Sequence, residues 1–142
     1  MFWGRVVVEQ FGEWWISRSP LLYEAPGVRV EVPVDFFTDF ASFPPCVRRV
    51  YDPTDARWSA AALVHDLLYE RHTVARLEAD RVFFAAMALP PAPAPPTPSY
   101  LRRLFYRGVR LGGARAYDSA PRRQAERLRM YQTMSAAIAL TL

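Results

Sequence analysis

The sequence predicts an α+β protein in which a small N-terminal antiparallel sheet packs on a bundle of about four helices. Short β-branched and aromatic runs fill the first 35 residues, and apolar residues recur at helical spacing after residue 54. A chain of 142 residues, 51% hydrophobic and 23% charged, suits one folded core. We therefore expect a single domain with four consecutive segments: a β-rich part (1–35), a loop and two-helix motif (36–89), a proline-rich spacer (90–98) and a basic helical part (99–142).

Three strands are predicted in the β-rich part, at residues 5–8, 13–16 and 28–32. Glycines and prolines between these runs mark the turns. The third run alternates valine with charged residues, as a strand with one buried face does. The stretch from Phe36 to Tyr51 has no clean period, so we expect a structured loop there.

Two helices are predicted in the motif segment. The sequence Asp52-Pro53-Thr54-Asp55 is typical of a helix start, because it places a capping side chain, a proline and acids at the positive helix end. We expect this helix to run to about His72. Thr73 then caps a second helix over residues 74–89.

The basic part is expected to contain two helices after a stiff, polyproline-like spacer. The first ends at Gly112-Gly113 and the second begins near Ser119. All 18 basic residues are arginine; residues 96–142 hold nine of them against two acids, a net charge of +7. This charge predicts a partner-binding face, with a solvated helix face as the alternative. Nucleic acid is not expected, since no nucleic-acid-binding motif accompanies the charge. The candidate partner-binding residues are Arg102, Arg103, Arg107, Arg110, Arg122 and Arg123.

The single cysteine, Cys46, excludes an internal disulfide framework. No basic leader followed by an apolar stretch begins the chain, so no signal peptide is expected. The longest uncharged run, residues 82–101, contains six prolines and is not expected to span a membrane.

Candidate chemistry centres on His65 and Asp80. Both stand on apolar faces of the two predicted helices. A buried carboxylate needs a partner, because an unpaired buried charge is costly. If the helices pack antiparallel, Asp80 comes level with His65 and binds one imidazole nitrogen. Tyr69, one turn beyond His65, is expected to steady the carboxylate.

Two interpretations of these residues stay open. Asp80 can orient His65 as the general base of a hydrolytic site, or His65, Tyr69 and Asp80 can form a polar network that only fixes helix register. Asp66 and Asp39 are candidate metal ligands. The alternative for the loop is that Asp39 and Ser42 cap backbone amides.

Four motifs in chain order resemble the domain-of-unknown-function 1353 family of tailed phages and prophages. They are VDFFTDFASFP (34–44), AAALVHDLLY (60–69), ADRVF (79–83) and YRGVRLGG (106–113), within a similar region of about residues 34–117. The resemblance implies a phage-type protein from a virion or tail gene module, in a family without an established activity.

The His-Asp-x-x-Tyr helix followed by a helix with Ala-Asp-Arg also resembles the catalytic helices of secretory phospholipases of the A-two type and their parvoviral counterparts. That resemblance implies that His65 activates water, that Asp66 binds calcium and that Asp80 orients the histidine, with Tyr69 matching the family's tyrosine. Calcium is thus the implied cofactor. The glycine-rich calcium loop of that family has no counterpart, since residues 28–107 contain no glycine, and its disulfides are absent.

The leading expectation is a virion-associated phage or prophage protein, a tail or connector component acting through protein–protein contacts. Its partners would be other virion proteins, including copies of itself within an assembly, and it would meet a membrane only during phage entry. We expect it to be made in the host cytoplasm and to reside in the virion. The alternative is a small hydrolase, phospholipase-like or cell-envelope-degrading, with His65 as general base and Asp80 as orienter.

Overall fold

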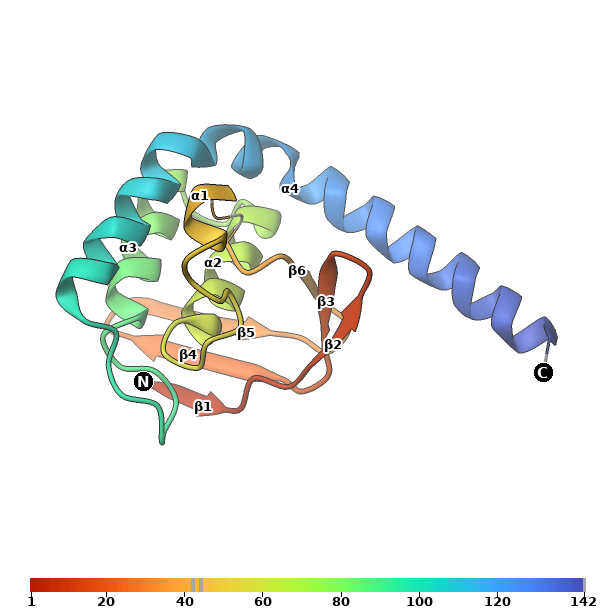
Figure 1. Cartoon of the computed structure of the whole chain (residues 1–142), viewed down its shortest axis with the longest axis horizontal. Coiled ribbons are helices and arrows are strands. Elements are labelled where there is room, and N and C mark those ends of the chain that lie inside the picture. Colours follow the sequence, from red (N-terminus) through yellow and green to blue (C-terminus); the bar gives the residue numbers. More distant parts are fainter. Residues whose placement is uncertain (42, 44, 142) are drawn as a thin grey trace.

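A computed structural model describes residues 1–41, 43 and 45–141 and has the predicted α+β architecture (Figure 1). Within this range the strands form two antiparallel three-stranded sheets. In one, β4 (Leu21–Ala25) lies between β1 (Phe2–Gly4) and β5 (Val28–Val32); in the other, β3 (Trp14–Ser17) lies between β2 (Val8–Phe11) and β6 (Phe37–Thr38). The predicted strand at residues 5–8 is wrong, because residues 5–7 connect β1 to β2.

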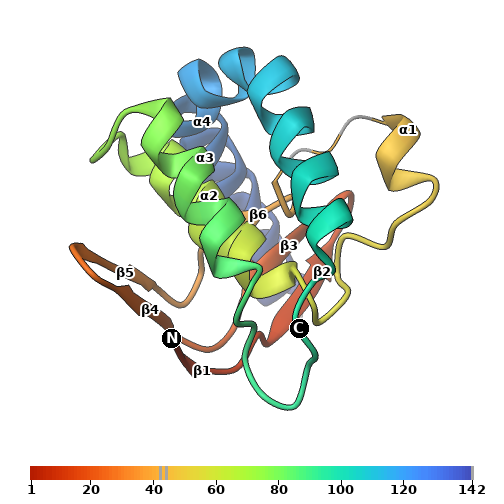
Figure 2. The ribbon, with the colours of Figure 1, turned by 90° about the vertical axis from the view of Figure 1, so that its left-hand side faces the viewer.

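The helices are α1 (Pro45–Arg48), α2 (Ser59–Arg71), α3 (Arg76–Ala86) and α4 (Ser99–Thr141). α2 is central, in contact with α3, α4 and β5 (Figures 1 and 2). Ten of its thirteen residues are buried. Its run of three alanines allows the neighbouring elements to approach closely. The core therefore surrounds α2, and Ser59 and His65 of this helix are buried within it.

α2 begins later than the sequence predicts. The Asp52 carboxylate accepts hydrogen bonds from the N–H (2.8 Å) and hydroxyl (2.7 Å) of Thr54, which closes a turn before the helix. The helix starts only at Ser59, whose N–H donates to the Asp55 carbonyl at 2.9 Å. The spacer also differs from the expected extended rod, because it turns where the Ala94 N–H donates to the Pro91 carbonyl.

The two helices expected in the basic part are a single helix, α4, which runs through both glycines. A glycine inside a helix is less favourable than alanine by about 1 kcal/mol. Gly113 is needed for packing, since a β carbon there would lie 2.6 Å from the hydroxyl oxygen of Tyr69 on α2. The glycine pair therefore marks a close helix–helix contact and does not end the helix.

Pro121 lies inside α4 and has no N–H to donate to the Tyr117 carbonyl. His72, at the end of α2, donates to that carbonyl from Nε2 at 2.7 Å, and its ring stacks on Tyr117 with centroids 4.1 Å apart. The Arg123 guanidinium and the Ser119 hydroxyl bond the carbonyls of residues 116 and 115. These side chains satisfy carbonyls around the proline, and the helix continues beyond the body of the protein (Figure 1).

None of the helices in the described parts of the chain is both long and apolar enough to cross a membrane.

We expect Gly113→Ala to lower the melting temperature, because the added methyl group must displace the buried Tyr69 ring. Gly112→Ala is the matched control, since a β carbon there meets no atom within 4 Å. That control gains helix propensity, up to about 1 kcal/mol, and should melt at the same or a higher temperature. Thermal unfolding followed by circular dichroism measures both variants. Equal melting temperatures for the two would contradict the close contact of α2 with α4.

Candidate functional site

The carboxylate of Asp80 joins three helices at a point with no exposed surface. Its Oδ1 atom accepts hydrogen bonds from His65 Nε2 at 2.8 Å and from the Tyr69 hydroxyl at 2.7 Å, both on α2. Its Oδ2 atom accepts a charged hydrogen bond from Arg110 Nη1 on α4 at 2.6 Å, and Arg76 Nη1 lies 3.7 Å away. The structure thus brings His65, Tyr69 and Asp80 together and adds two arginines that the sequence analysis did not place there.

The ionised state of Asp80 determines the direction of its hydrogen bond with His65. Burial acts to raise the pKa of the Asp80 carboxyl, but the hydrogen bonds from His65, Tyr69 and Arg110 outweigh it and hold the pKa below its ordinary value. An ionised carboxylate only accepts hydrogen bonds, so His65 Nε2 carries the proton. In the neutral form of the imidazole, the Nδ1 atom then carries the lone pair. It is buried and has no hydrogen-bond partner within the described chain, and Asp66 Oδ1 lies 3.9 Å from it.

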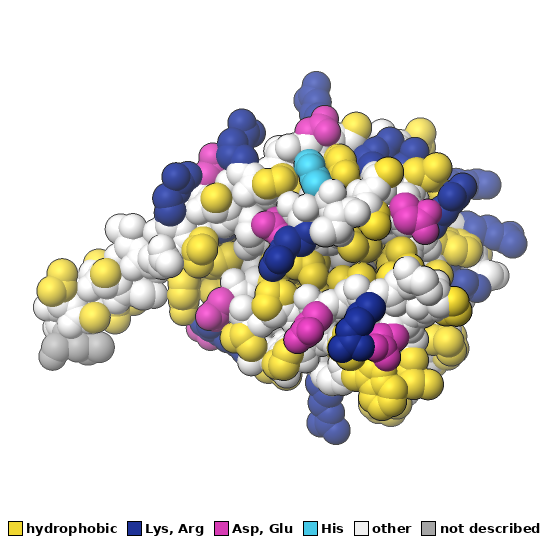
Figure 3. Space-filling view, turned by 180° about the vertical axis from the view of Figure 1, so that it is seen from behind, with side chains coloured by type: hydrophobic (Ala, Val, Ile, Leu, Met, Phe, Trp, Pro, Cys, Tyr) yellow, Lys and Arg dark blue, Asp and Glu magenta, His cyan; other side chains and the backbone are white. Residues whose placement is uncertain are grey.

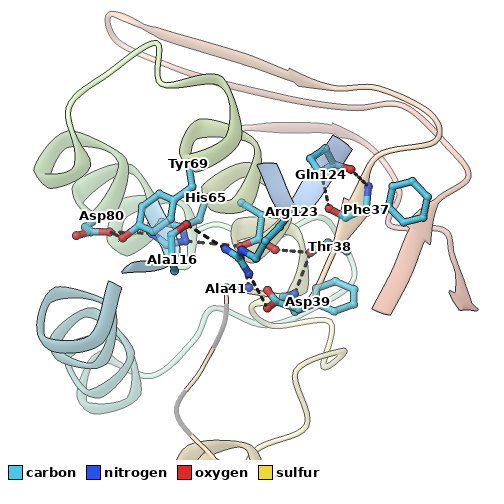
Figure 4. Close-up of polar contacts among 12 residues, drawn as sticks. Phe37, Thr38, Asp39, Ala41, His65, Tyr69, Asp80, Ala116, Arg123 and Gln124 are labelled. Atoms are coloured by element: carbon cyan, nitrogen blue, oxygen red, sulfur yellow. Dashed lines mark hydrogen bonds and ion pairs between the residues drawn. The ribbon is translucent and has the colours of Figure 1, made fainter. Parts of the chain in front are cut away.

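A cavity of about 250 Å³ lies beside the histidine. α2 contributes His65, Asp66 and Tyr69 to its lining, and the loop after β6 contributes Asp39 and Ala41. The opposite wall belongs to α4, through Gly108, Val109, Gly112, Gly113, Ala116, Ala120, Arg123, Gln124 and Arg127. Figure 4 shows Arg123 between the His65–Asp80 pair and the Asp39 loop. His65 lines the cavity although it exposes only 1% of its surface.

Asp66 holds the loop that forms one side of the cavity. Its Oδ2 atom accepts a short hydrogen bond from the Thr38 hydroxyl, and its Oδ1 atom accepts one from the Ala41 N–H at 3.0 Å. The Phe40 N–H donates to the Thr38 hydroxyl oxygen at 2.9 Å. Phe40 and Ala41 have positive φ angles of 57° and 70°, which cost about 1–2 kcal/mol per residue outside glycine. The Asp66 carboxylate helps to offset this strain.

Asp66 is a weaker acid than an ordinary aspartic acid. Burial, followed by the nearby charge of Asp39, raises the pKa of Asp66 to about 6. His65 and the hydrogen bonds from Thr38 and Ala41 act in the opposite direction without cancelling the rise. Protonation of Asp66 therefore changes near neutral pH, directly beside the free nitrogen of His65.

The arrangement of Asp66 and Asp39 does not fit calcium. Both oxygens of Asp66 accept protein hydrogen bonds, and Asp39 Oδ2 lies 3.6 Å from Arg48 Nη2 and 3.7 Å from Arg123 Nη1. No three His, Cys, Asp or Glu side chains within residues 1–41, 43 and 45–141 are placed to hold a metal ion. Calcium takes about six to eight oxygen ligands. Cationic guanidinium groups therefore stand beside the carboxylate that the sequence suggested as a metal ligand.

The six arginines predicted to bind a partner lie in different environments. Arg110 and Arg123 turn inward, to Asp80 and to the cavity, and Arg102 covers the Phe84 ring at 5.0 Å. Arg103, Arg107 and Arg122 are exposed. A partner-binding role for them stays a prediction. Ser42, the other predicted capping residue, lies outside the described residues.

Two cavity residues were missed by the sequence analysis. Gln124 exchanges two hydrogen bonds with the backbone of Phe37, at 2.9 and 3.0 Å, and so attaches α4 to β6 (Figure 4). Arg127 is buried over the Trp14 ring, 4.4 Å from its centroid. The sequence feature that could have located them is their spacing: the cavity-lining residues recur every three or four positions from Ala116 to Arg127, as on one face of a helix. The predicted break at Gly112-Gly113 separated this face from Gly108, Val109 and the glycine pair, which line the same cavity.

We expect Asp66→Asn to flatten the pH dependence of stability. With a folded pKa of about 6 and an unfolded pKa of about 3.9, the folded state binds the proton more tightly. The unfolding free energy of the wild type should therefore fall as pH rises from about 4 to about 6, by at most about 2.7 kcal/mol from this group. Urea unfolding from pH 4 to 8 measures the slope. The control is the same substitution at exposed Asp118, and parallel profiles for wild type and Asp66→Asn would contradict the assignment.

Comparison with known proteins identifies the family of the chain. No curated protein and no solved structure matches it significantly. The model of the family described as "Protein of unknown function (DUF1353)" matches residues 15–95. This range includes the loop of Asp39 and both helices of the His65–Asp80 pair, and it ends before the motif at residues 106–113. Because the match covers more than half of the sequence, the chain belongs to the DUF1353 family.

Proposed function

We propose that this protein is a hydrolase in which His65 is the general base that activates water for attack on an ester. One observation carries the proposal: His65 lines the cavity, its Nε2 is fixed by Asp80, and its buried Nδ1 has no hydrogen-bond partner among the described residues. Leaving a buried polar atom unpaired is unfavourable by about 1–3 kcal/mol. A network with only a structural role would not require this unpaired atom.

The geometry supports a simple reaction sequence. A water molecule donates a hydrogen bond to His65 Nδ1, and its oxygen attacks the ester carbonyl while its proton passes to Nδ1. The imidazolium that forms is stabilised by the ionised Asp80, to which Nε2–H remains bonded. When the tetrahedral intermediate collapses, Nδ1–H returns the proton to the leaving alcohol. Because the Nδ1 atom is fully enclosed, a neighbouring side chain must shift to admit the water.

His65→Asn should reduce ester hydrolysis by about 10²- to 10⁴-fold, the usual contribution of a general base. The matched control is His72→Asn, which changes the other histidine, the exposed one that bonds the Tyr117 carbonyl. The measurement is the release of p-nitrophenol from short-chain esters, with phospholipid vesicles and peptidoglycan as further substrates. Equal turnover by the wild type and His65→Asn on every substrate would leave only the structural interpretation of the pair.

A role in the virion is the second candidate, favoured by the end of α4. Residues 132–141 extend away from the body (Figure 3), are exposed and include no charged residue. Met134, Ile138 and Leu140 are among the exposed large hydrophobic side chains. Such an arm suits contacts with another virion protein. Mass spectrometry of purified phage particles tests this role. A fixed small copy number per particle would support it, and absence from the particles would reject it.

A further inference from the structure

Arg127 is a largely buried cation for which the described residues provide no hydrogen bond and no ion pair. It exposes 8% of its surface and lines the cavity. Among the described residues its guanidinium makes no hydrogen bond and no ion pair, and its close contact is the Trp14 ring. Arginine does not lose its proton in proteins, so this position keeps a full positive charge. A buried charge of this kind is costly unless a counter-charge is nearby.

Arg123, one helical turn earlier on α4, lines the same cavity and has an N–H group that makes no hydrogen bond within the described chain. Its Nη2 atom donates to the Ala116 carbonyl at 3.0 Å, its Nη1 atom lies 3.7 Å from Asp39, and its buried Nε–H has no partner within the described chain. The two guanidinium groups therefore offer several unused N–H donors on one wall. Guanidinium groups bind carboxylate and phosphate oxygens with strong, directional hydrogen bonds.

The acids that line the cavity neutralise this wall only in part. Asp66 is bonded to the loop, Glu70 is paired with Arg71 at 2.9 Å, and Asp39 is shared between Arg48 and Arg123. Asp39 and Asp66 act on Arg127 only through space, beyond the distance of an ion pair.

From this arrangement we infer that the cavity binds an anionic oxygen group between Arg127 and Arg123, and that the substrate is an ester that carries a carboxylate or phosphate. This inference rests on the proposed hydrolase function. His65 and Tyr69 line the α2 side of the cavity and the arginines line the α4 side. A substrate anchored at the arginines thus presents its reacting carbonyl toward the histidine. The anchor supplies orientation that a neutral ester lacks.

Anion binding is tested without any reaction. Inorganic phosphate and acetate are titrated at constant ionic strength while the melting temperature is followed, with chloride as the reference anion. Both probes should raise the melting temperature of the wild type, and Arg127→Gln should weaken their binding at least about tenfold. The control is Arg129→Gln, which removes an exposed arginine of the same helix. Equal stabilisation of Arg127→Gln and wild type would overturn the inference.

The ligand-free proteins provide a second readout. If Arg127 serves an absent anion, Arg127→Gln should melt at the same temperature as the wild type or higher, because it removes an uncompensated charge. A large fall in melting temperature would assign Arg127 to the stability of the fold and reject the inference. Arg127→Lys keeps the charge and should retain part of the phosphate binding.

Selectivity is tested with two p-nitrophenyl esters, neutral butyrate and anionic glutarate. The wild type should favour the glutarate, and Arg127→Gln should lower the ratio of the two kcat/KM values at least about tenfold, while Arg129→Gln keeps it. Phosphatidylglycerol vesicles distinguish the source of the anion: cleavage of the lipid alone assigns it to a headgroup, and cleavage of the glutarate ester assigns it to a soluble substrate.

Failures of the two proposals can be separated. Phosphate binding that requires Arg127, without hydrolysis of any ester, would reject the hydrolase and support the anion site. Hydrolysis that requires His65, with no anion binding and no preference for the glutarate, would support the hydrolase and overturn the inference.

Discussion

Asp80 places a full negative charge where no solvent reaches it, and the groups around it compensate that charge. Two hydrogen bonds come from α2 and one charged hydrogen bond comes from α4, so a single carboxylate sets the register of three helices. Arg110 supplies a positive charge to the carboxylate, and His65 donates to it through Nε2. The same interaction therefore holds the helices together and determines which imidazole nitrogen keeps its lone pair.

In the loop after β6, polar side chains stabilise a left-handed backbone conformation that glycine usually adopts. Residues 28–107 contain no glycine, yet Phe40 and Ala41 adopt left-handed backbone conformations in succession. The Thr38 hydroxyl and the Asp66 carboxylate bind the N–H groups of these two residues, so local strain is held by polar contacts at the edge of the cavity. An aspartate that the sequence suggested as a metal ligand instead shapes the backbone.

The sequence predicted those parts of the site that depend on spacing within one or two helices. The pairing of His65 with Asp80, and the position of Tyr69 one turn away, follow from helical periodicity and from the cost of an unpaired carboxylate. Arg110 and Arg127 could not be placed in this way, because they reach the site through the packing of α4 against α2 and the sheets. Gly113 and Pro121 are normally unfavourable inside a helix, and the glycine pair was therefore predicted to end one. The contact with Tyr69 and the bond from His72 override that propensity, and both depend on residues more than forty positions away.

The continuity of α4 has a mechanical consequence. Beyond Pro121 one rigid segment carries Arg123, Gln124 and Arg127 at the cavity and then ten exposed residues, 132–141, which extend about 15 Å at the usual rise of a helix. At Pro121 one main-chain hydrogen bond is missing, and side chains bond the carbonyls around it. A partner that pulls on residues 132–141 would therefore also pull on the part of α4 that carries Arg123 and Arg127. The exposed segment and one wall of the cavity thus belong to the same continuous helix.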